Sequence, residues 1–359
     1  MHLFVYEYLS GGGLLGHAGP AGGLRSLLAE GRAMCGAVAA DFASINGVDV
    51  TCLRDARPGD WRPEGCRCVD VHSSDEHDHA FDHCAAEADW TLVIAPEIGG
   101  VLAERCRRPI ALGGRLLASP PALIELASDK HATAEHLRRA GVPAPRGIPF
   151  MLGEKWPNDF SYPAIWKPRD GAGSEGLRYV EHSGVQVPES DGRPGRLEEF
   201  QKSGVAASVA FLCGREARVA LPPCAQRLDH DFHYLGGSLP LPAELARRAI
   251  RLGQRTIDSL PEPLGYLGVD LELGGQADGS GDVVIEINPR LTTSYIGLRA
   301  ACRENLAEAM LAIASGQSYS LTFCEDRIEF AVEGDVAGDH ASLYHLRFCD
   351  FTAHRPDSA

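Results

Sequence analysis

The sequence predicts an α/β protein in which an N-terminal α/β domain is followed by two β-rich lobes of α+β character. Three observations support this fold class. Apolar runs alternate with helix-like stretches over about the first hundred residues, as in a parallel sheet covered by helices. From Tyr162 onward, short apolar runs are bounded by turn residues, as in antiparallel sheets. Two further runs flank the glycine-rich segment 274–281, which indicates a hairpin.

The N-terminal elements follow from hydrophobic periodicity. Strands are expected at 3–8, 48–53 and 90–95, and a helix at 23–44. Residues 55–89 are polar and rich in turn residues, so we expect loops there.

Two helices are then predicted from their start signals. Ser119-Pro120-Pro121 opens the first, because proline is tolerated in the first turn of a helix. Ser128-Asp129 caps the second, which ends near Arg139 because Gly141 and Pro143 stop it.

The β-rich part completes the domain organisation. Its expected strands are 164–166, 176–180, 197–200, 208–212, 216–220, 268–273 and 282–287, and its expected helices are 242–259 and 302–314. We therefore expect an N-terminal α/β domain at 1–115, a first lobe at 116–190, a second lobe at 191–320 and a C-terminal β tail at 321–359.

Composition excludes several classes of protein. The chain has 359 residues, with 34 basic and 49 acidic side chains, and its net charge is −15. It has no basic run longer than two arginines, which argues against a nucleic-acid surface. No apolar stretch approaches the roughly 18 residues that span a bilayer, and we expect no signal peptide from the strand-like start at 3–6. The 11 scattered cysteines fit reduced thiols, so we expect a cytoplasmic protein.

The strongest chemical signal is a set of polar residues on the predicted hairpin. Glu286 and Asn288 alternate along one strand and therefore share a face, and Asp270 lies on the partner strand. Two carboxylates and an amide oxygen suit Mg²⁺, which prefers oxygen ligands. The alternative is a salt-bridged strand pair in which Arg290 neutralises Glu286.

A glycine-rich loop follows the strand that ends near Lys167. Glycines let backbone amides turn toward an anion, and a lysine beside them adds a positive charge for phosphate. The loop does not match the Walker A pattern, and by itself it is equally typical of a simple hairpin. Its candidate phosphate-binding residues are Lys167, Gly171, Gly173, Ser174 and Gly176.

Two more segments complete a recognisable order. Lys130 opens a predicted helix, and Glu198-Glu199-Phe200-Gln201 ends a predicted strand. Together with Lys167, its loop and the Asp270 to Arg290 set, these segments resemble the ATP-grasp ligases over about residues 116–315. More narrowly, 4–13 and 288–299 resemble the tyramine–glutamate ligase group of methanofuran biosynthesis.

The resemblance implies a nucleotide site. Lys130 and Lys167 would contact the α- and β-phosphates of ATP, under a loop closed by Gly171 to Gly176. The adenine would meet the main chain at Phe200 and Gln201, with Glu198 or Glu199 reaching its amino group.

The resemblance also implies the chemistry. Asp270, Glu286 and Asn288 would hold two Mg²⁺ ions, for which Mn²⁺ could substitute, with Glu286 bridging them, and Arg290 would steady the γ-phosphoryl group. A carboxylate, that of the L-glutamate side chain, would form an acyl phosphate and be attacked by tyramine or tyrosine. The partners would be small molecules, with no nucleic acid or membrane; the sequence is compatible with a homodimer.

One position departs from the family pattern. Many ATP-grasp enzymes place a glutamate a few residues beyond the hinge to bind the ribose, but Ala206 and Ala207 stand there. The ribose contact would then come from elsewhere, with Glu199 or Gln201 as candidates.

Three weaker signals remain. Gly11 to Gly16 formally matches a dinucleotide-binding loop, although Gly and Pro follow where a helix should start. His72, His77, His79 and His83 could suggest zinc, but their irregular spacing favours a solvated polar loop. The segment 226–237 could line an acceptor pocket through Gln226 and Arg227, or be an ordinary connector. The functions that compete with a ligase are thus an ATP-binding regulatory module without turnover and an NAD-dependent oxidoreductase.

Overall fold

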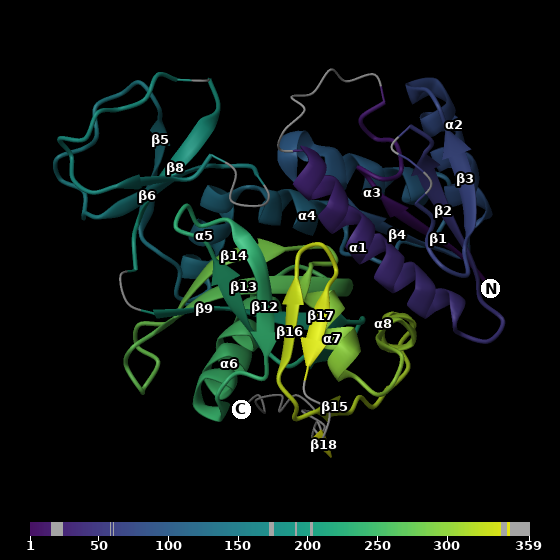
Figure 1. The fold of residues 1–359 in the computed structure, drawn as a ribbon. Coiled ribbons are helices and arrows are strands. Elements are labelled where there is room, and N and C mark those ends of the chain that lie inside the picture. The colour runs from purple at the N-terminus through teal and green to yellow at the C-terminus, as the bar shows by residue number, and fades with distance from the viewer. Residues whose placement is uncertain are drawn as a thin grey trace, which may run out of the picture.

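Four parallel strands form the N-terminal sheet, in the order β3-β2-β1-β4 (Figure 1). Their bounds are β1 His2–Glu7, β2 Asp49–Asp55, β3 Arg67–Val71 and β4 Trp90–Ile94. Helix α1 (Leu24–Ala43) packs on one face, and α2 (Ser74–Glu87) and α3 (Val101–Ala111) pack on the other. The computed structural model describes residues 1–15, 24–57, 59, 61–171, 176–190, 192–201, 204–338 and 343–344.

The prediction of loops at 55–89 is wrong, because this stretch contains strand β3 and helix α2. The Ser73 side chain caps α2 by accepting a hydrogen bond from the Glu76 amide. His77, Phe81 and Cys84 then face inward at helical spacing, and the His77 ring lies 2.9 Å from the Tyr6 hydroxyl. The histidine-rich stretch is therefore an amphipathic helix, with one of its histidines in the domain core.

A second, antiparallel sheet forms a separate lobe, drawn in teal in Figure 1. Its strands are β5 Gly147–Met151, β6 Ala164–Pro168, β7 Arg178–Val180 and β8 Pro194–Glu199, in the order β5-β8-β6-β7. Phe150, Trp166 and Leu197 belong to the core of this lobe. Strand β8 lies inside the sheet, so the boundary expected at residue 190 runs between two strands of one lobe.

The large sheet has the order β14-β13-β9-β11-β12-β16-β17, with β10 paired to β9. Its strands are β9 Gly204–Cys213, β10 Arg218–Ala220, β11 Cys224–Leu228, β12 Tyr234–Leu239, β13 Gly265–Gly274, β14 Val283–Asn288, β16 Ile328–Ala331 and β17 Val336–Gly338. Helix α6 (Ala243–Ser259) covers one face through an apolar cluster that includes Val209, Val269 and Leu252. Part of the expected C-terminal tail therefore extends this sheet.

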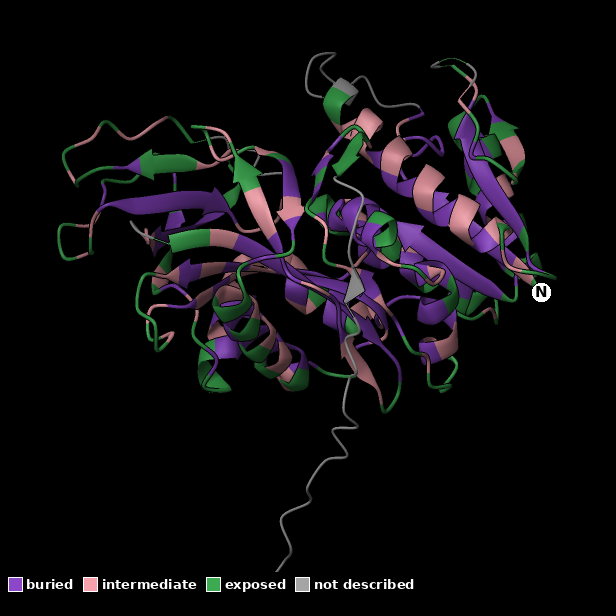
Figure 2. Ribbon diagram, turned by 60° about the horizontal axis from the view of Figure 1, so that its bottom comes forward, coloured by how far each residue is buried: buried purple, intermediate pink, exposed green. Residues whose placement is uncertain are grey.

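The remaining elements connect these units. They are the short 3-10 helix η1 (Ile98–Gly100), α4 (Pro121–Ser128), α5 (Lys130–Arg139), α7 (Ser294–Ala301), α8 (Leu306–Ala314) and the strand pair β15 (Phe323–Cys324) and β18 (Leu343–Tyr344). Figure 2 shows that buried residues concentrate in the strands, while exposed residues gather at turns and on outer helix faces. In the part of the chain that the structure describes, no helix is long and apolar enough to cross a membrane.

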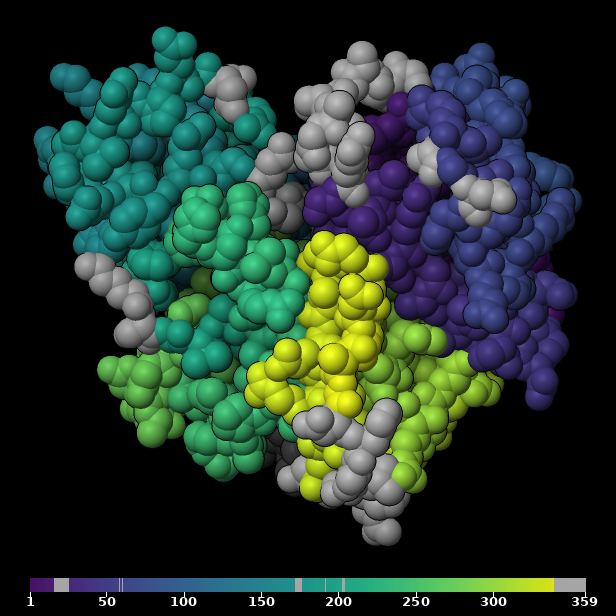
Figure 3. Space-filling view, viewed as in Figure 1, coloured from purple at the N-terminus to yellow at the C-terminus, as the bar shows by residue number. Residues whose placement is uncertain are grey.

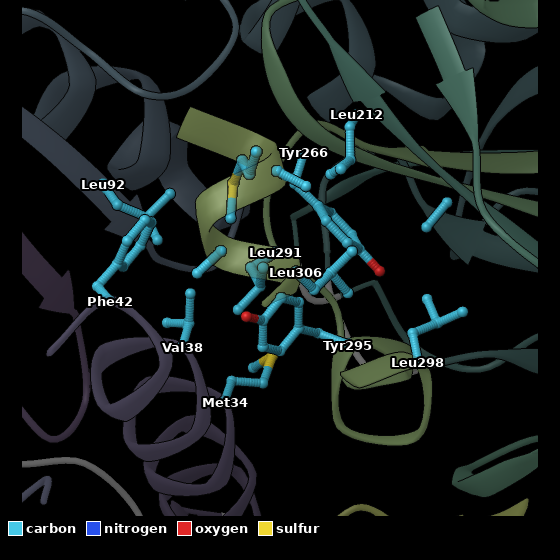
Figure 4. Packing of buried hydrophobic residues seen from close by; sticks show 14 of the residues in the cluster. Met34, Val38, Phe42, Leu92, Leu212, Tyr266, Leu291, Tyr295, Leu298 and Leu306 are labelled. Carbon is cyan, nitrogen blue, oxygen red and sulfur yellow. The ribbon is translucent and has the colours of Figure 1, made fainter. Parts of the chain in front are cut away.

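One apolar core joins the N-terminal domain to the large sheet. Met34 and Val38 of α1 lie beside Leu291 and Tyr295, which follow β14, and Phe42 of α1 lies beside Leu92 of β4 (Figure 4). The two parts therefore form one packed body around α1, and the predicted fold class is confirmed.

Candidate functional site

Strands β13 and β14 bring the expected acids together. Asp270 is directly opposite Glu286 in the antiparallel register, and Gly268 is opposite Asn288. The Asn288 amide donates a hydrogen bond of 2.9 Å from Nδ2 to Oδ2 of Asp270. Because that bond uses the amide nitrogen, the Asn288 oxygen is left to act as an acceptor or ligand.

The environment of Asp270 disfavours an isolated negative charge. Burial, together with the negative charge of Glu286, raises the pKa of Asp270 to about 7. Hydrogen bonds from Asn288 and from Nε2 of Gln226, at 2.8 Å, act in the opposite direction. A bound cation would relieve the repulsion between the two carboxylates.

The donor set fits a hard metal ion. Asp270, Glu286 and Asn288 offer oxygen ligands, as Mg²⁺ requires. Among the described residues, no group of three or more His, Cys, Asp or Glu side chains is placed to hold a metal ion. The third protein oxygen at this site would therefore be the Asn288 amide, and α2 with its histidines offers no alternative metal site.

Lys130 links the glycine-rich loop to the oxygen ligands Asp270, Glu286 and Asn288, which we call the acid set. Asp129 caps α5 by accepting the amides of His131 and Ala132, and this cap fixes Lys130 at the start of the helix. Its Nζ donates to Oε1 of Glu286 at 2.6 Å and to the Gly171 carbonyl at 2.8 Å. Burial opposes the charge of this ammonium, but Glu286, together with the charges of Glu97 and Glu198, outweighs it and raises the pKa of Lys130.

Lys167 comes from β6 and forms a buried ion pair. Its Nζ lies 2.6 Å from Oε1 of Glu198 on the neighbouring β8. The other oxygen of Glu198 accepts Nε of Arg196 at 3.0 Å. The Glu198 carboxylate thus lies between two cations, Lys167 and Arg196, so this group of three side chains has a net positive charge.

A small cavity connects the two lysine sites. It has a volume of about 10 Å³, and Lys130, Glu198 and Glu286 all line it. The two lobes therefore approach each other closely at this point.

The segment after β8 connects the small lobe to the large sheet. The Phe200 amide donates to the Pro163 carbonyl at 3.1 Å, and the Phe200 ring lies edge-on to Tyr179 and Phe232. Glu199 is partly buried, as is Gln201. This aromatic cluster lies at the segment where the hinge is expected.

Sequence reasoning missed the partner of Arg290. Nε and one Nη of Arg290 donate to the two oxygens of Glu97, at 2.8 and 3.2 Å. Glu97 is buried and follows β4, at the carboxyl edge of the N-terminal sheet, where ligands bind in open α/β sheets. Its position just beyond a buried strand is the one sequence signal that could have identified it.

A larger cavity of about 520 Å³ lies beside these residues. It is bounded by the start of α3 on one side and by residues 169–171 and 192–194 on the other. The Gly99 amide donates to Asp170 across it at 3.0 Å. Figure 3 shows the notch between the teal lobe and the purple N-terminal domain.

Some expected site residues are elsewhere or are not described. Gly173 and Ser174 lie outside the described residues, whereas Gly176 has a φ of +80°, which favours glycine. Gln226 reaches Asp270, but Arg227 is exposed and donates to the Leu235 carbonyl at 3.0 Å.

The dinucleotide loop lacks its helix in the described part of the chain. Strand β1 ends at Glu7, and residues 8–15 form turns. Residues 16–23 are outside the described residues, and α1 is described from Leu24. Within the described residues, Gly11 to Gly13 lie in turns and not at the start of the helix that this motif requires.

Comparison with known proteins agrees with the observed fold. An ATP-grasp domain model matches residues 127–294, and a pre-ATP-grasp domain model matches residues 48–124. The chain is 26% identical over 273 residues to the carbamoyl phosphate synthase large chain of Mycobacterium bovis, which covers 69% of this chain and 23% of that protein. The chain thus spans about a quarter of the length of the curated relatives that it matches.

Solved structures with the same fold include three of interest. An Archaeoglobus fulgidus protein assigned to the ATP-grasp superfamily has a TM-score of 0.67 and 22% identity, with 91% of this chain and 92% of that chain covered. The biotin carboxylase–ATP complex of Campylobacter jejuni has a TM-score of 0.69 and 16% identity, with 91% and 75% covered. An L-amino acid ligase from Bacillus licheniformis has a TM-score of 0.64 and 15% identity, with 91% and 79% covered.

Proposed function

The chain is an ATP-grasp superfamily protein with an N-terminal pre-grasp domain, and on that premise we propose that it is an ATP-dependent carboxylate–amine ligase. The observation that carries the proposal is that two lysines lie close to the acid set, one in direct contact with it and one through Glu198. Lys130 bonds directly to Glu286, and Glu198 beside Lys167 lines the same cavity as both. A phosphate chain and a divalent cation require this mixture of charges.

We assign the nucleotide by its parts. The adenine would lie against the main chain of Phe200 and Gln201, and the phosphates against Lys130 and Lys167. Two Mg²⁺ ions held by Asp270, Glu286 and Asn288 would neutralise charge on the phosphoryl group in transfer, and Mn²⁺ would substitute for them.

The cations of the site exchange partners when ATP binds. In the structure, Lys130 pairs with Glu286, Lys167 with Glu198 and Arg290 with Glu97. The phosphates of ATP would compete for these cations, and Arg290 would turn toward the γ-phosphoryl group. Positive charge is therefore preorganised at the site and need not be gathered during the reaction.

The reaction proceeds in two steps. The substrate carboxylate attacks the γ-phosphorus, the bond to the β-phosphate oxygen breaks, and ADP leaves an acyl phosphate behind. The amine then attacks the acyl carbon, loses a proton and expels phosphate, which leaves an amide.

For substrates we propose the side-chain carboxylate of L-glutamate and an aromatic amine, tyramine or tyrosine. The support is the resemblance of 4–13 and 288–299 to the tyramine–glutamate ligase group. A cavity of about 520 Å³ beside Glu97 has room for a molecule of this size. The Bacillus licheniformis protein of the same fold acts, by its name, on L-amino acids.

The test is a screen for ADP release over amino acids paired with amines, with mass analysis of the product. We expect an amide product from glutamate and an aromatic amine, and none from the Glu286→Gln variant. Stabilisation by Mg²⁺-ATP without ADP release over the whole panel would favour a regulatory module. Thermal stabilisation by NADH and none by Mg²⁺-ATP would overturn the ligase proposal.

A further inference from the structure

Glu272 lies on the same face of the large sheet as the acid set. Side chains alternate along β13, so Asp270 and Glu272 share one face. The intervening Leu271 points to the opposite face, where it joins the apolar cluster under α6. Glu272 is only partly buried, unlike its apolar neighbours Leu271 and Leu273.

The position of Glu272 along the strand is intermediate between two parts of the site. Asp270, at one end, belongs to the acid set, and Gly274, at the other, pairs with Gly204 just beyond the hinge segment. Two residues of a strand cover about 6.6 Å, so Glu272 lies one such step from each. In the proposed nucleotide orientation the adenine lies at the hinge and the phosphates at the acid set. The sugar must lie between them, beside Glu272.

The Glu272 carboxylate lies against the backbone of Gly204. A Cβ atom built on Gly204 would lie 2.3 Å from Oε1 of Glu272, so a glycine is needed for the carboxylate to occupy this place. Within the described ranges, no hydrogen bond or ion pair involves this carboxylate, although Glu286 and Glu198 of the same site each have a cationic partner. A half-buried carboxylate of this kind is suited to accept hydrogen bonds from a ligand.

The residue across from Glu272 makes space for that ligand. Ala206 on β9 is the direct cross-strand partner of Glu272. Its methyl group leaves the neighbouring volume free and offers no polar atom of its own. The acid that the sequence lacks at 206 and 207 is thus present on the adjacent strand.

We propose that Glu272 binds the ribose of ATP by accepting hydrogen bonds from the 2′- and 3′-hydroxyls. The inference rests on the proposed ATP-binding function. The two oxygens of one carboxylate match two vicinal hydroxyls, and hydrogen bonds to a charged acceptor are stronger than neutral ones. Glu272 thereby makes the site selective for ribonucleotides.

The test compares Mg²⁺-ATP with Mg²⁺-2′,3′-dideoxy-ATP by calorimetry on the full chain. We expect the wild type to bind ATP about tenfold more tightly than the dideoxy nucleotide, and Glu272→Ala to bind both equally at the weaker level. Glu272→Gln, which keeps the shape of the side chain and one acceptor, should be intermediate. Glu333→Ala, at an exposed turn between β16 and β17, is the control and should match the wild type.

Rescue provides a second readout. Ala206→Glu in the Glu272→Ala background should restore the preference for ATP, because it returns a carboxylate to the same cross-strand pair. Undiminished preference for ATP in both Glu272 variants would overturn the ribose assignment and leave the ligase proposal intact. A wild type that binds neither nucleotide would overturn both.

Discussion

The Lys130 ammonium and the Glu286 carboxylate lie 2.6 Å apart, although they are 156 positions apart in the sequence. With Lys167–Glu198 and Arg290–Glu97, this pair gives each expected phosphate-binding cation an acidic partner. Each pair joins two different segments of the chain, so these ion pairs fix the positions of the site residues relative to one another.

Lys167 and Lys155 give a matched pair of variants. Lys167→Met removes the cation buried beside Glu198, and we expect the apparent KM for ATP to rise about 10- to 100-fold, the value of a hydrogen bond to a charged group. Lys155 is exposed, so Lys155→Met should leave KM unchanged. ADP release at varied ATP concentration measures both, and equal KM values for the two variants would contradict the assignment.

The contribution of Arg290 to catalysis should depend on its planar guanidinium group, which can form two hydrogen bonds at once. Arg290→Lys keeps the charge and loses the two-point contact, so we expect kcat to fall about 100-fold with the fold retained. Arg299 makes a comparable two-point contact with Asp41 on α1, outside the acid set. The control Arg299→Lys should therefore keep the wild-type kcat; a similar loss in both variants would indicate a structural role for Arg290.

Asp70 should contribute to stability in an acid-sensitive way. A hydrogen-bonded ion pair with Arg54 lowers the pKa of Asp70 to about 2. A pKa lowered by folding gives stability that is complete above the ordinary carboxyl value and is lost as pH falls through the folded value. Because Asp70 is a third exposed, we expect a contribution of about 1–2 kcal/mol.

The measurement is urea unfolding at a series of pH values. As pH falls from about 5 to about 2, the wild type should lose about 1–2 kcal/mol more than Asp70→Asn. Asp75→Asn, at an exposed position of α2, should follow the wild-type curve. An equal loss of unfolding free energy in the wild type and Asp70→Asn over this pH range would contradict the assigned role of Asp70.

Two helical glycines should respond oppositely to alanine. A Cβ atom on Gly297 of α7 would lie 2.2 Å from the buried Phe330 ring, so Gly297→Ala should destabilise the protein by about 1–3 kcal/mol. A Cβ atom on Gly36 of α1 would meet Trp61 at an ordinary 3.7 Å, so Gly36→Ala should stabilise it by about 0.5–1 kcal/mol. Denaturant unfolding measures the change in the free energy of unfolding for each variant. A change of the same sign in both variants would contradict the packing argument.

Local patterns predicted much of this molecule. Alternation along the second strand of the predicted hairpin was enough to place Glu286 and Asn288 on one face, and Ser128-Asp129 was enough to place Lys130 at a helix start. The helix at 74–87 was missed because its polar composition hid an apolar spacing of His77, Phe81 and Cys84. Glu97 was missed for another reason. Its contact with Arg290 spans 193 positions, and no local periodicity encodes such a pairing.

The packing of α1 has a consequence for how the protein opens. One core includes α1, the N-terminal sheet and the segment after β14, whereas the lobe of β5 to β8 has a core of its own. Amide hydrogens in the first unit should exchange with solvent through one shared global unfolding event. Amides of β5 to β8 should exchange sooner, through sub-global opening of a separate foldon, and bound nucleotide should slow them most.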